Sequence, residues 1–241
     1  MNKWQINKSL LSKFLESNAK LSNSFIFHLS DNSYSIAASE DITLILLTQL
    51  ATTDVNFNQT LNIPDCNRLC KAIDAIDTES IELKIDNNNL AYKDSQVKFK
   101  YHLLEDGFLN SPPVNIDKIN AFNFDAEFKV SKALIQNIIK HSAFASTTNK
   151  IYFYTEKQDG INILFAELTD RVKSNTDSIT IKMAEVDFAL NPMAINFNNL
   201  RLVSLIDDIV KIKINNEFGI IVMDITSTDI ELKYIFSTLT Q

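Results

Sequence analysis

Glycine is nearly absent from this sequence, which has only Gly107, Gly160 and Gly219 in 241 residues. Because a loop that cradles a phosphate needs several glycines close together, these three cannot build one. The two cysteines and three histidines also lack the spacing of a metal site. These absences argue against an enzyme, and we expect a protein that performs no catalysis and needs neither a cofactor nor a metal.

Long hydrophobic runs are absent as well. The longest candidate, ITLILLTQLA, has the length of a strand and falls short of the roughly 18 apolar residues that cross a bilayer. The first residues, MNKWQINKSLLSKFL, have neither the apolar core nor the cleavage site of a secretory signal. We therefore expect a cytoplasmic protein with no membrane partner, located in the host cytoplasm if it is viral.

Strand-like runs rich in β-branched and aromatic residues dominate what is present, and only four segments show the three- and four-residue apolar spacing of a helix. The predicted helices span residues 8–20, 65–76, 131–145 and 197–206. The second follows Pro64 and Asp65 and the third begins at Ser131, residues that favour a helix start.

The two cysteines lie on the second predicted helix, within LNIPDCNRLCKAIDAID. Cys66, Leu69, Cys70 and Ile73 occupy positions i, i+3, i+4 and i+7, which form one apolar stripe. We expect both thiols to point into the core as structural groups. Metal binding is the alternative, and it would need further ligands that the sequence does not place nearby.

The formal net charge of −7 argues against nucleic acid, because phosphate binding relies on clustered Lys and Arg. The distribution of charge points the other way. The four predicted helices carry eight basic residues against three acidic ones, Glu16, Asp65 and Asp74. The basic residues are Lys8, Lys13, Lys20, Arg68, Lys71, Lys132, Lys140 and Arg201. Each of them could simply solvate an exposed helix face, but together they predict a positive surface for a polyanion.

The sequence also repeats. The order helix, polar turn, strand, turn, strand from Ser9 recurs from Ser131, and the segment from Leu61 parallels INFNNLRLVSLIDDIVKIKINNEFGIIVMD, with Arg68 aligned on Arg201. We predict an N-terminal domain over 1–106, a connector over 107–122 and a C-terminal domain over 123–241.

This repeated unit, together with the run from Thr169 to Lys173 and the long strands after it, resembles the sliding clamps of tailed bacteriophages, which are related in fold to proliferating cell nuclear antigen. The resemblance implies an α+β fold of two similar domains, each with two helices packed on antiparallel sheets. It also implies a closed homotrimeric ring that encircles duplex DNA without reading its sequence. DNA polymerase and a clamp loader are the implied partners in replication, and the ring acts as a processivity factor.

The same resemblance implies a pocket beside the connector that takes short apolar peptides of partner proteins. The candidate lining residues are Ile42, Leu44, Phe108, Leu109, Val114 and Ile230, and burial in the core is the alternative for each of them. The ring is expected to close between an edge strand at 97–103 of one copy and one at 177–184 of the next. Lys98, Lys100 and Lys182 lie on these strands, where facing like charges would weaken the closure.

A structural β-rich virion or adhesion protein with duplicated domains is the competing interpretation. Such a protein does not need helices with a uniformly basic face. The mass in solution distinguishes the two, since a ring has three chain masses.

Overall fold

The computed structural model describes residues 2–51, 55, 57–86, 88–112, 114, 118, 121–145, 148–173 and 175–239. It contains the same order of elements twice: strand, helix, four strands, helix, three strands. The first series is β1 (Asn2–Asn7), α1 (Lys8–Ala19), β2 (Phe25–Leu29), β3 (Asn32–Ala38), β4 (Leu44–Ala51), β5 (Gln59–Ile63), α2 (Cys66–Asp74), β6 (Ser80–Ile85), β7 (Asn89–Lys93) and β8 (Lys98–His102). The second is β9 (Ala126–Ser131), α4 (Lys132–His141), β10 (Lys150–Gln158), β11 (Ile161–Leu168), β12 (Ile179–Val186), β13 (Met193–Asn196), α5 (Phe197–Arg201), β14 (Ile209–Asn215), β15 (Ile220–Thr226) and β16 (Ile230–Ser237).

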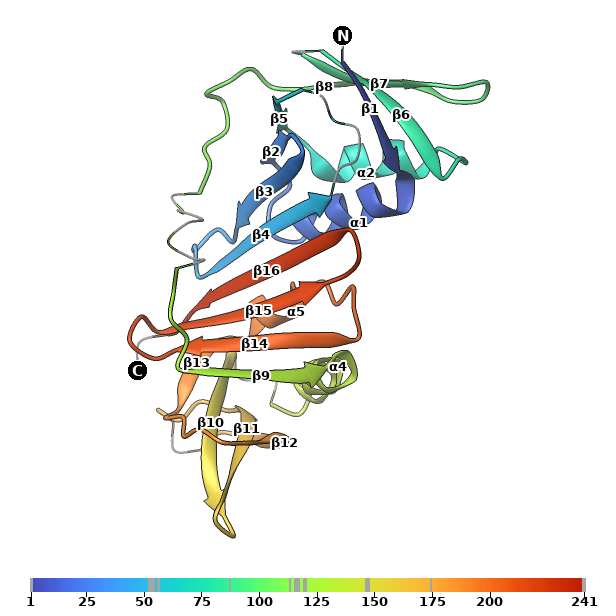
Figure 1. Cartoon of the computed structure of the whole chain (residues 1–241). Coiled ribbons are helices and arrows are strands. Elements are labelled where there is room, and N and C mark those ends of the chain that lie inside the picture. The colour runs from blue at the N-terminus through green and yellow to red at the C-terminus, as the bar shows by residue number, and fades with distance from the viewer. Residues whose placement is uncertain are drawn as a thin grey trace. The chain divides into compact units, whose positions relative to one another are not determined.

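The chain forms two compact units (Figure 1). The first consists of Met1–Asn115 with Thr226–Lys233, and the second of Ile116–Ile225 with Tyr234–Gln241. Residues 226–233 belong to the first unit because the first half of β16 lies beside β4. The boundaries predicted from the sequence, and an origin of the two series by duplication, stay predictions.

Each unit is built from two antiparallel sheets. In the first unit the strand orders are β1-β6-β7-β8 and β5-β2-β3-β4, with β16 next to β4. In the second unit they are β9-β14-β15-β16 and β13-β10-β11-β12. The two sets correspond strand for strand in chain order. Within the described residues, β8 and β12 each lie at the outer end of a sheet.

The helices begin where a side chain can satisfy free N–H groups of the first turn. The Asn7 side chain accepts a hydrogen bond from the backbone of Leu10, and Ser131 accepts one from Leu134 in the same position of the second unit. Asp65 accepts from the Arg68 N–H, and this bond lowers the pKa of the Asp65 carboxyl group. These caps confirm the predicted helix starts.

All four helices are shorter than predicted: α1 ends one residue early and α2 two residues early, and the other two end four or five residues early. The last ends at Arg201 rather than residue 206, because the Ser204 N–H donates to the hydroxyl of Tyr234 instead of continuing the helix. The third ends at His141 rather than residue 145. There the Ser142 hydroxyl donates to the carbonyl of Ile139 and closes the last turn.

Helix α1 packs on the sheet of β2, β3 and β4 through its apolar side. The Phe14 ring lies 4.5 Å from the ring of Phe27, centroid to centroid, and both side chains are buried. Asn18, on the same side, donates to Thr48 and accepts from Ser35. This buried polar contact attaches the helix to two strands, and α2 packs beside α1.

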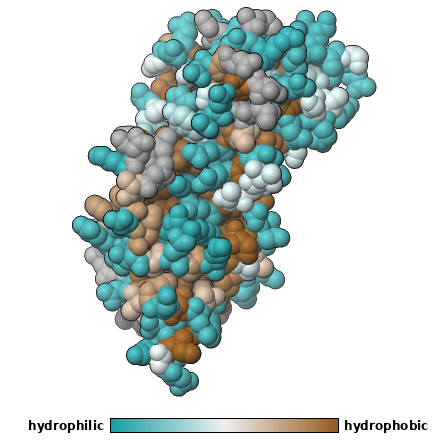
Figure 2. Space-filling model, viewed as in Figure 1, coloured by the Kyte–Doolittle hydropathy of each residue, from teal (hydrophilic) through white to brown (hydrophobic). Residues whose placement is uncertain are grey.

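The surface visible in Figure 2 is mainly hydrophilic, with small separate apolar areas. No helix in the described part of the chain is long and apolar enough to cross a membrane.

Candidate nucleic-acid and peptide surfaces

The basic helix residues are mostly free of acidic partners. All of them except Lys8 and Lys132 are exposed, and those two are half-buried. Every ion pair found among the described residues involves other cations, such as Lys150 with Asp170 and Lys213 with Asp224. Glu16 lies near Lys20, and Asp65 lies near Arg68 and Lys71, but these carboxylates form no ion pair with the helix cations. Because a cation outside an ion pair keeps much of its attraction for an anion, this set can attract one.

Lys8 has a structural role. Its ammonium group donates to the carbonyl oxygens of Asp74, at 3.1 Å, and Ile76. These carbonyls lie at the end of α2 and just beyond it, where a cation is favourable. Of the residues predicted to face DNA, Lys8 is therefore held by α2 and is the least free.

Both arginines of the basic helix set lie on aromatic rings. The guanidinium of Arg68 lies 5.5 Å from the centre of the Tyr101 ring, and that of Arg201 lies 4.7 Å from the centre of the Phe197 ring. Burial raises the pKa of the Tyr101 hydroxyl to about 12, so this group stays protonated and bonded to Asp65. Ring contacts of this kind orient the guanidinium group without neutralising its positive charge.

The thiols differ from each other. Cys66 is buried as predicted, with its sulfur 3.2 Å from the Leu15 carbonyl oxygen, but Cys70 is only half-buried. The prediction that both thiols point fully into the core is therefore wrong for Cys70, which lies at the edge of the apolar stripe. The hydrogen bond with Cys70 and burial raise the pKa of the Cys66 thiol. No cluster of metal-binding side chains occurs among the described residues.

The predicted peptide-binding residues separate into three groups. Ile42, Phe108 and Leu109 line one pocket of about 330 Å³ in the first unit. Leu44 is fully buried in the core, and Ile230 is 3% exposed and lines a different pocket. Val114 is half-buried and does not line either pocket.

The sequence analysis missed the floor of the first pocket. Ile26 and Ile36 face each other on β2 and β3 and line it, together with Ala38. Their signal was in the sequence, because the apolar residues of SFIFHLS fall on both faces of the strand rather than alternating with polar ones. One face covers the core and the other forms this floor.

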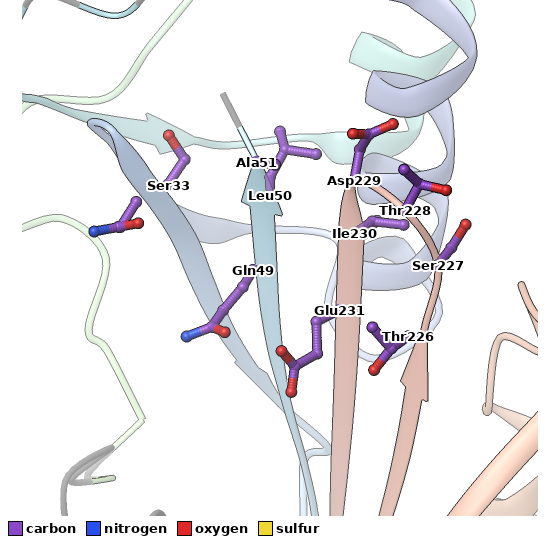
Figure 3. A pocket seen from close by; sticks show the side chains of 11 residues that line it. Ser33, Gln49, Leu50, Ala51, Thr226, Ser227, Thr228, Asp229, Ile230 and Glu231 are labelled. Carbon is purple, nitrogen blue, oxygen red and sulfur yellow. The ribbon is translucent and has the colours of Figure 1, made fainter. Parts of the chain in front are cut away.

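The second pocket, of about 440 Å³, lies between the ends of β4 and β16 in the first unit (Figure 3). Gln49 and Glu231 come from these neighbouring strands, and Asp229 and Thr228 come from the turn before β16. Its side chains are mainly polar, so it is a poorer place for an apolar peptide than the pocket under Phe108.

No protein-family model matches the chain, and no curated protein matches it. Solved structures do match. The whole chain superposes on 99% of PCNA from A. fulgidus, in a structure with the C-terminal region of FEN-1 bound, with a TM-score of 0.75 and 14% identity. The fold is that of the sliding clamps.

Two further clamps support this assignment of the fold. PCNA from Entamoeba histolytica matches with a TM-score of 0.71 and 16% identity, over 99% of this chain and 98% of that one. The DNA polymerase III beta chain of Streptococcus pneumoniae matches all of this chain with a TM-score of 0.74 and 14% identity. The match covers 65% of that beta chain, so this clamp-fold chain spans about two thirds of its length.

Proposed function

We propose that the protein is a DNA sliding clamp without catalytic activity. Three copies form a closed ring around duplex DNA, a clamp loader opens the ring, and the ring holds a replicative DNA polymerase on its template in the cytoplasm. The proposal includes a bacteriophage origin, which the resemblance of the sequence implies. The main support is the combination of a clamp fold over the whole chain with basic helix residues that form no ion pair within the described part of the chain.

The charge distribution supports sliding rather than tight binding. The lining would carry Lys13, Lys20, Arg68, Lys71, Lys132, Lys140 and Arg201, with Lys8 mainly structural. Exposed cations attract phosphates weakly and without reading sequence. A closed ring needs no stronger contact, because linkage around the duplex keeps it in place. The net charge of −7 places an acidic surface elsewhere, which discourages DNA from binding there.

The strand order supports closure by a head-to-tail strand pair. Within the first unit β16 lies beside β4, and the Ala51 N–H donates to the Asp229 carbonyl oxygen at 2.9 Å. By position in the two series, β12 corresponds to β4 and β8 corresponds to β16. An equivalent pair between β12 of one copy and β8 of the next would close the ring and cover both free edges.

The pocket under Phe108 and Leu109 is the proposed site for partner peptides. Its apolar floor and the exposed side chains of Ile42 and Phe108 suit a short apolar segment. A. fulgidus PCNA, which shares the fold, holds the C-terminal region of FEN-1. For this chain the corresponding partners are the polymerase and the clamp loader.

Charge reversal tests the lining. The test variant combines Lys13→Glu, Arg68→Glu, Lys132→Glu and Arg201→Glu. We expect it to lose duplex binding at low salt, measured by fluorescence anisotropy. It should also no longer stimulate primer extension by the cognate polymerase. The matched control changes four exposed strand lysines, Lys3, Lys93, Lys129 and Lys157, to Glu. Its net charge therefore equals that of the test variant. Unchanged primer extension by the helix variant would contradict the proposal.

Mass in solution tests the ring. Light scattering should give three chain masses, and electron-microscope images should show an annulus. A monomer or a fibre would favour the competing structural protein. Lys182→Glu should stabilise the trimer, because it removes a positive charge on β12 that would face Lys98 and Lys100 on β8 of the next copy.

A further inference from the structure

A polar pocket of about 410 Å³ lies in the second unit, between the end of α4 and the beginning of α5. The lining residues are Ser142, Ala143, Thr148, Asn149, Phe197, Asn198 and Arg201. None of these described lining residues carries a carboxylate, and Arg201 carries a positive charge. The pocket therefore favours an anion over a cation.

Arg201, Asn149 and Asn198 supply the hydrogen-bond donors of this pocket, and within the described residues only the Arg201 side chain is held by other side chains. Arg201 is held at the pocket wall, because one guanidinium nitrogen donates to the Ser142 hydroxyl oxygen at 2.9 Å and the group lies over the Phe197 ring. Its other N–H groups have no hydrogen-bond partner among the described residues. The side-chain amides of Asn149 and Asn198 are exposed and likewise make no hydrogen bond within the described structure.

The hydroxyl groups of the pocket are already used. The Ser142 hydroxyl donates to Ile139, and the Thr148 hydroxyl donates to Thr169 while accepting from the Lys150 N–H. These two hydroxyl groups fix the shape of the pocket. Among the described lining residues, only Arg201 and the side-chain amides of Asn149 and Asn198 remain to donate hydrogen bonds to a ligand. A guanidinium fork with neighbouring amide donors matches the oxygens of a phosphate group.

The corresponding place in the first unit is built differently. The Cys66 N–H donates to the Asn23 carbonyl oxygen just as the Phe197 N–H donates to that of Asn149, both at 2.6 Å. Counting from these bonds, Asn67 corresponds to Asn198, and Cys70 corresponds to Arg201. The alignment of Arg68 with Arg201 that the sequence suggested is therefore wrong by two residues, because Arg68 corresponds to Asn199.

The first unit closes this place with its own side chains. The Asn67 backbone N–H and side-chain amide both donate to the side-chain oxygen of Asn23, at 3.0 and 2.9 Å. Cys70 replaces the arginine with a half-buried thiol. The donors that are free in the second unit are thus satisfied or missing in the first.

We propose that the pocket formed by Arg201, Asn149 and Asn198 binds a phosphate group of the DNA backbone, and that the first unit has no equivalent site. This inference rests on the proposed clamp function. It makes the proposed DNA surface unequal in the two units, with one defined phosphate contact in each copy of the chain and diffuse attraction elsewhere.

Binding of inorganic phosphate to the full-length protein tests the pocket without DNA. In a nitrogen-15 NMR titration, the side-chain signals of Arg201, Asn149 and Asn198 should shift and saturate together, whereas those of Asn23 and Asn67 should not move. Arg201→Lys keeps the charge but lacks the fork, so it should weaken phosphate binding several-fold. Shifts spread evenly over all basic helix residues, or no saturation, would overturn the proposal.

Duplex binding distinguishes the DNA backbone from a free phosphate compound. The uncharged double variant Asn149→Ala/Asn198→Ala should lower duplex affinity by at least about tenfold at low salt, because neither side chain can then donate a hydrogen bond to the phosphate. The matched variant Asn23→Ala/Asn67→Ala should leave it within about twofold, with folding of both variants checked by thermal melting. Equal affinity of the first variant and wild type would overturn the DNA assignment.

The two failures are separable. If the wild-type protein does not bind duplex at all, the clamp function fails, and the inference that DNA supplies the phosphate fails with it. The phosphate titration still decides whether the pocket is an anion site.

Discussion

The outer faces of β2–β3 in the first unit and β10–β11 in the second are built on the same strand order but present different surfaces. In the first unit Ile26 faces Ile36 and His28 stacks on Tyr34. Phe108 and Leu109, which follow β8, line a pocket together with residues of this face. An apolar strand face and a loop above it therefore produce an open site.

In the second unit aromatic rings take the same positions. Tyr152 lies opposite Glu167, and Tyr154 lies opposite Phe165. The Arg171 guanidinium lies 4.7 Å from the centre of the Tyr152 ring and 4.6 Å from that of Tyr154, and its Nε donates to Glu167 at 3.0 Å. A cation held by a carboxylate thus covers rings that would otherwise be accessible.

The difference shows that one fold can leave a pocket on this face in one unit and cover the equivalent face in the other. The difference depends on a few side chains: Phe108 and Leu109, which follow β8, in the first unit, and Arg171, which follows β11, in the second. Arg171, in the run Thr169–Lys173 that carried part of the resemblance, has a partner on each side and so is a local structural element of this face.

The largest expected effect is on the open face. Phe108→Ala/Leu109→Ala should reduce binding of the cognate polymerase by at least about tenfold, because truncating apolar anchors of a peptide pocket costs about 2 kcal/mol or more. Stability should change little, since the Phe108 side chain is 70% exposed. Surface plasmon resonance measures the affinity and thermal melting the stability.

The matched control on the closed face is Val172→Ala. Val172 is 78% exposed but lies beside Arg171 rather than over an open pocket. It should bind the polymerase as the wild type does. A comparable loss of affinity from Val172→Ala would show that the two faces are not functionally different.

A smaller effect is expected from opening the closed face. Arg171→Ala removes two ring contacts and an ion pair, so it should lower the free energy of unfolding by about 1–2 kcal/mol in urea titration. Arg68→Ala removes one longer ring contact and should cost about 0.5 kcal/mol. Equal losses from the two variants would mean that the Arg171 arrangement adds no stability beyond that of an exposed arginine.

The smallest effects concern the thiols on the helix side of the first unit. Cys66→Ala should destabilise by about 1 kcal/mol because Cys66 is fully buried, and Cys70→Ala by less because Cys70 is half-buried. Chemical denaturation measures both. Zinc found in the purified protein, and lost from either variant, would contradict the structural role of these thiols.

Local signals in the sequence were sufficient for the helix starts and, apart from Cys70, for the buried stripe of α2. The caps Asn7, Asp65 and Ser131 act within three residues of the chain, and the stripe of Cys66, Leu69 and Ile73 depends only on the helical period. The helix ends were harder to predict. The last helix stops because Ser204 meets Tyr234, a contact between residues 30 positions apart that no local pattern reveals.

The candidate sites divide in the same way. Residue type and helical period were enough to predict an exposed basic set, because charge and spacing are properties of the chain. The pockets could not be predicted, because they depend on which loop passes over which strand: Ile42 lines a pocket while Leu44, two residues away, is fully buried. Asn149, Asn198 and Arg201 likewise come together only through folding.

The sequence alone determined an α+β chain with four amphipathic helices, a basic helix surface and two similar series of elements, since these depend on composition and short-range periodicity. Only the tertiary structure decided which strand faces are open, which cations have partners and which donors converge on a pocket. Those properties arise from contacts between segments distant in the chain, where the packing of a few side chains outweighs any local preference.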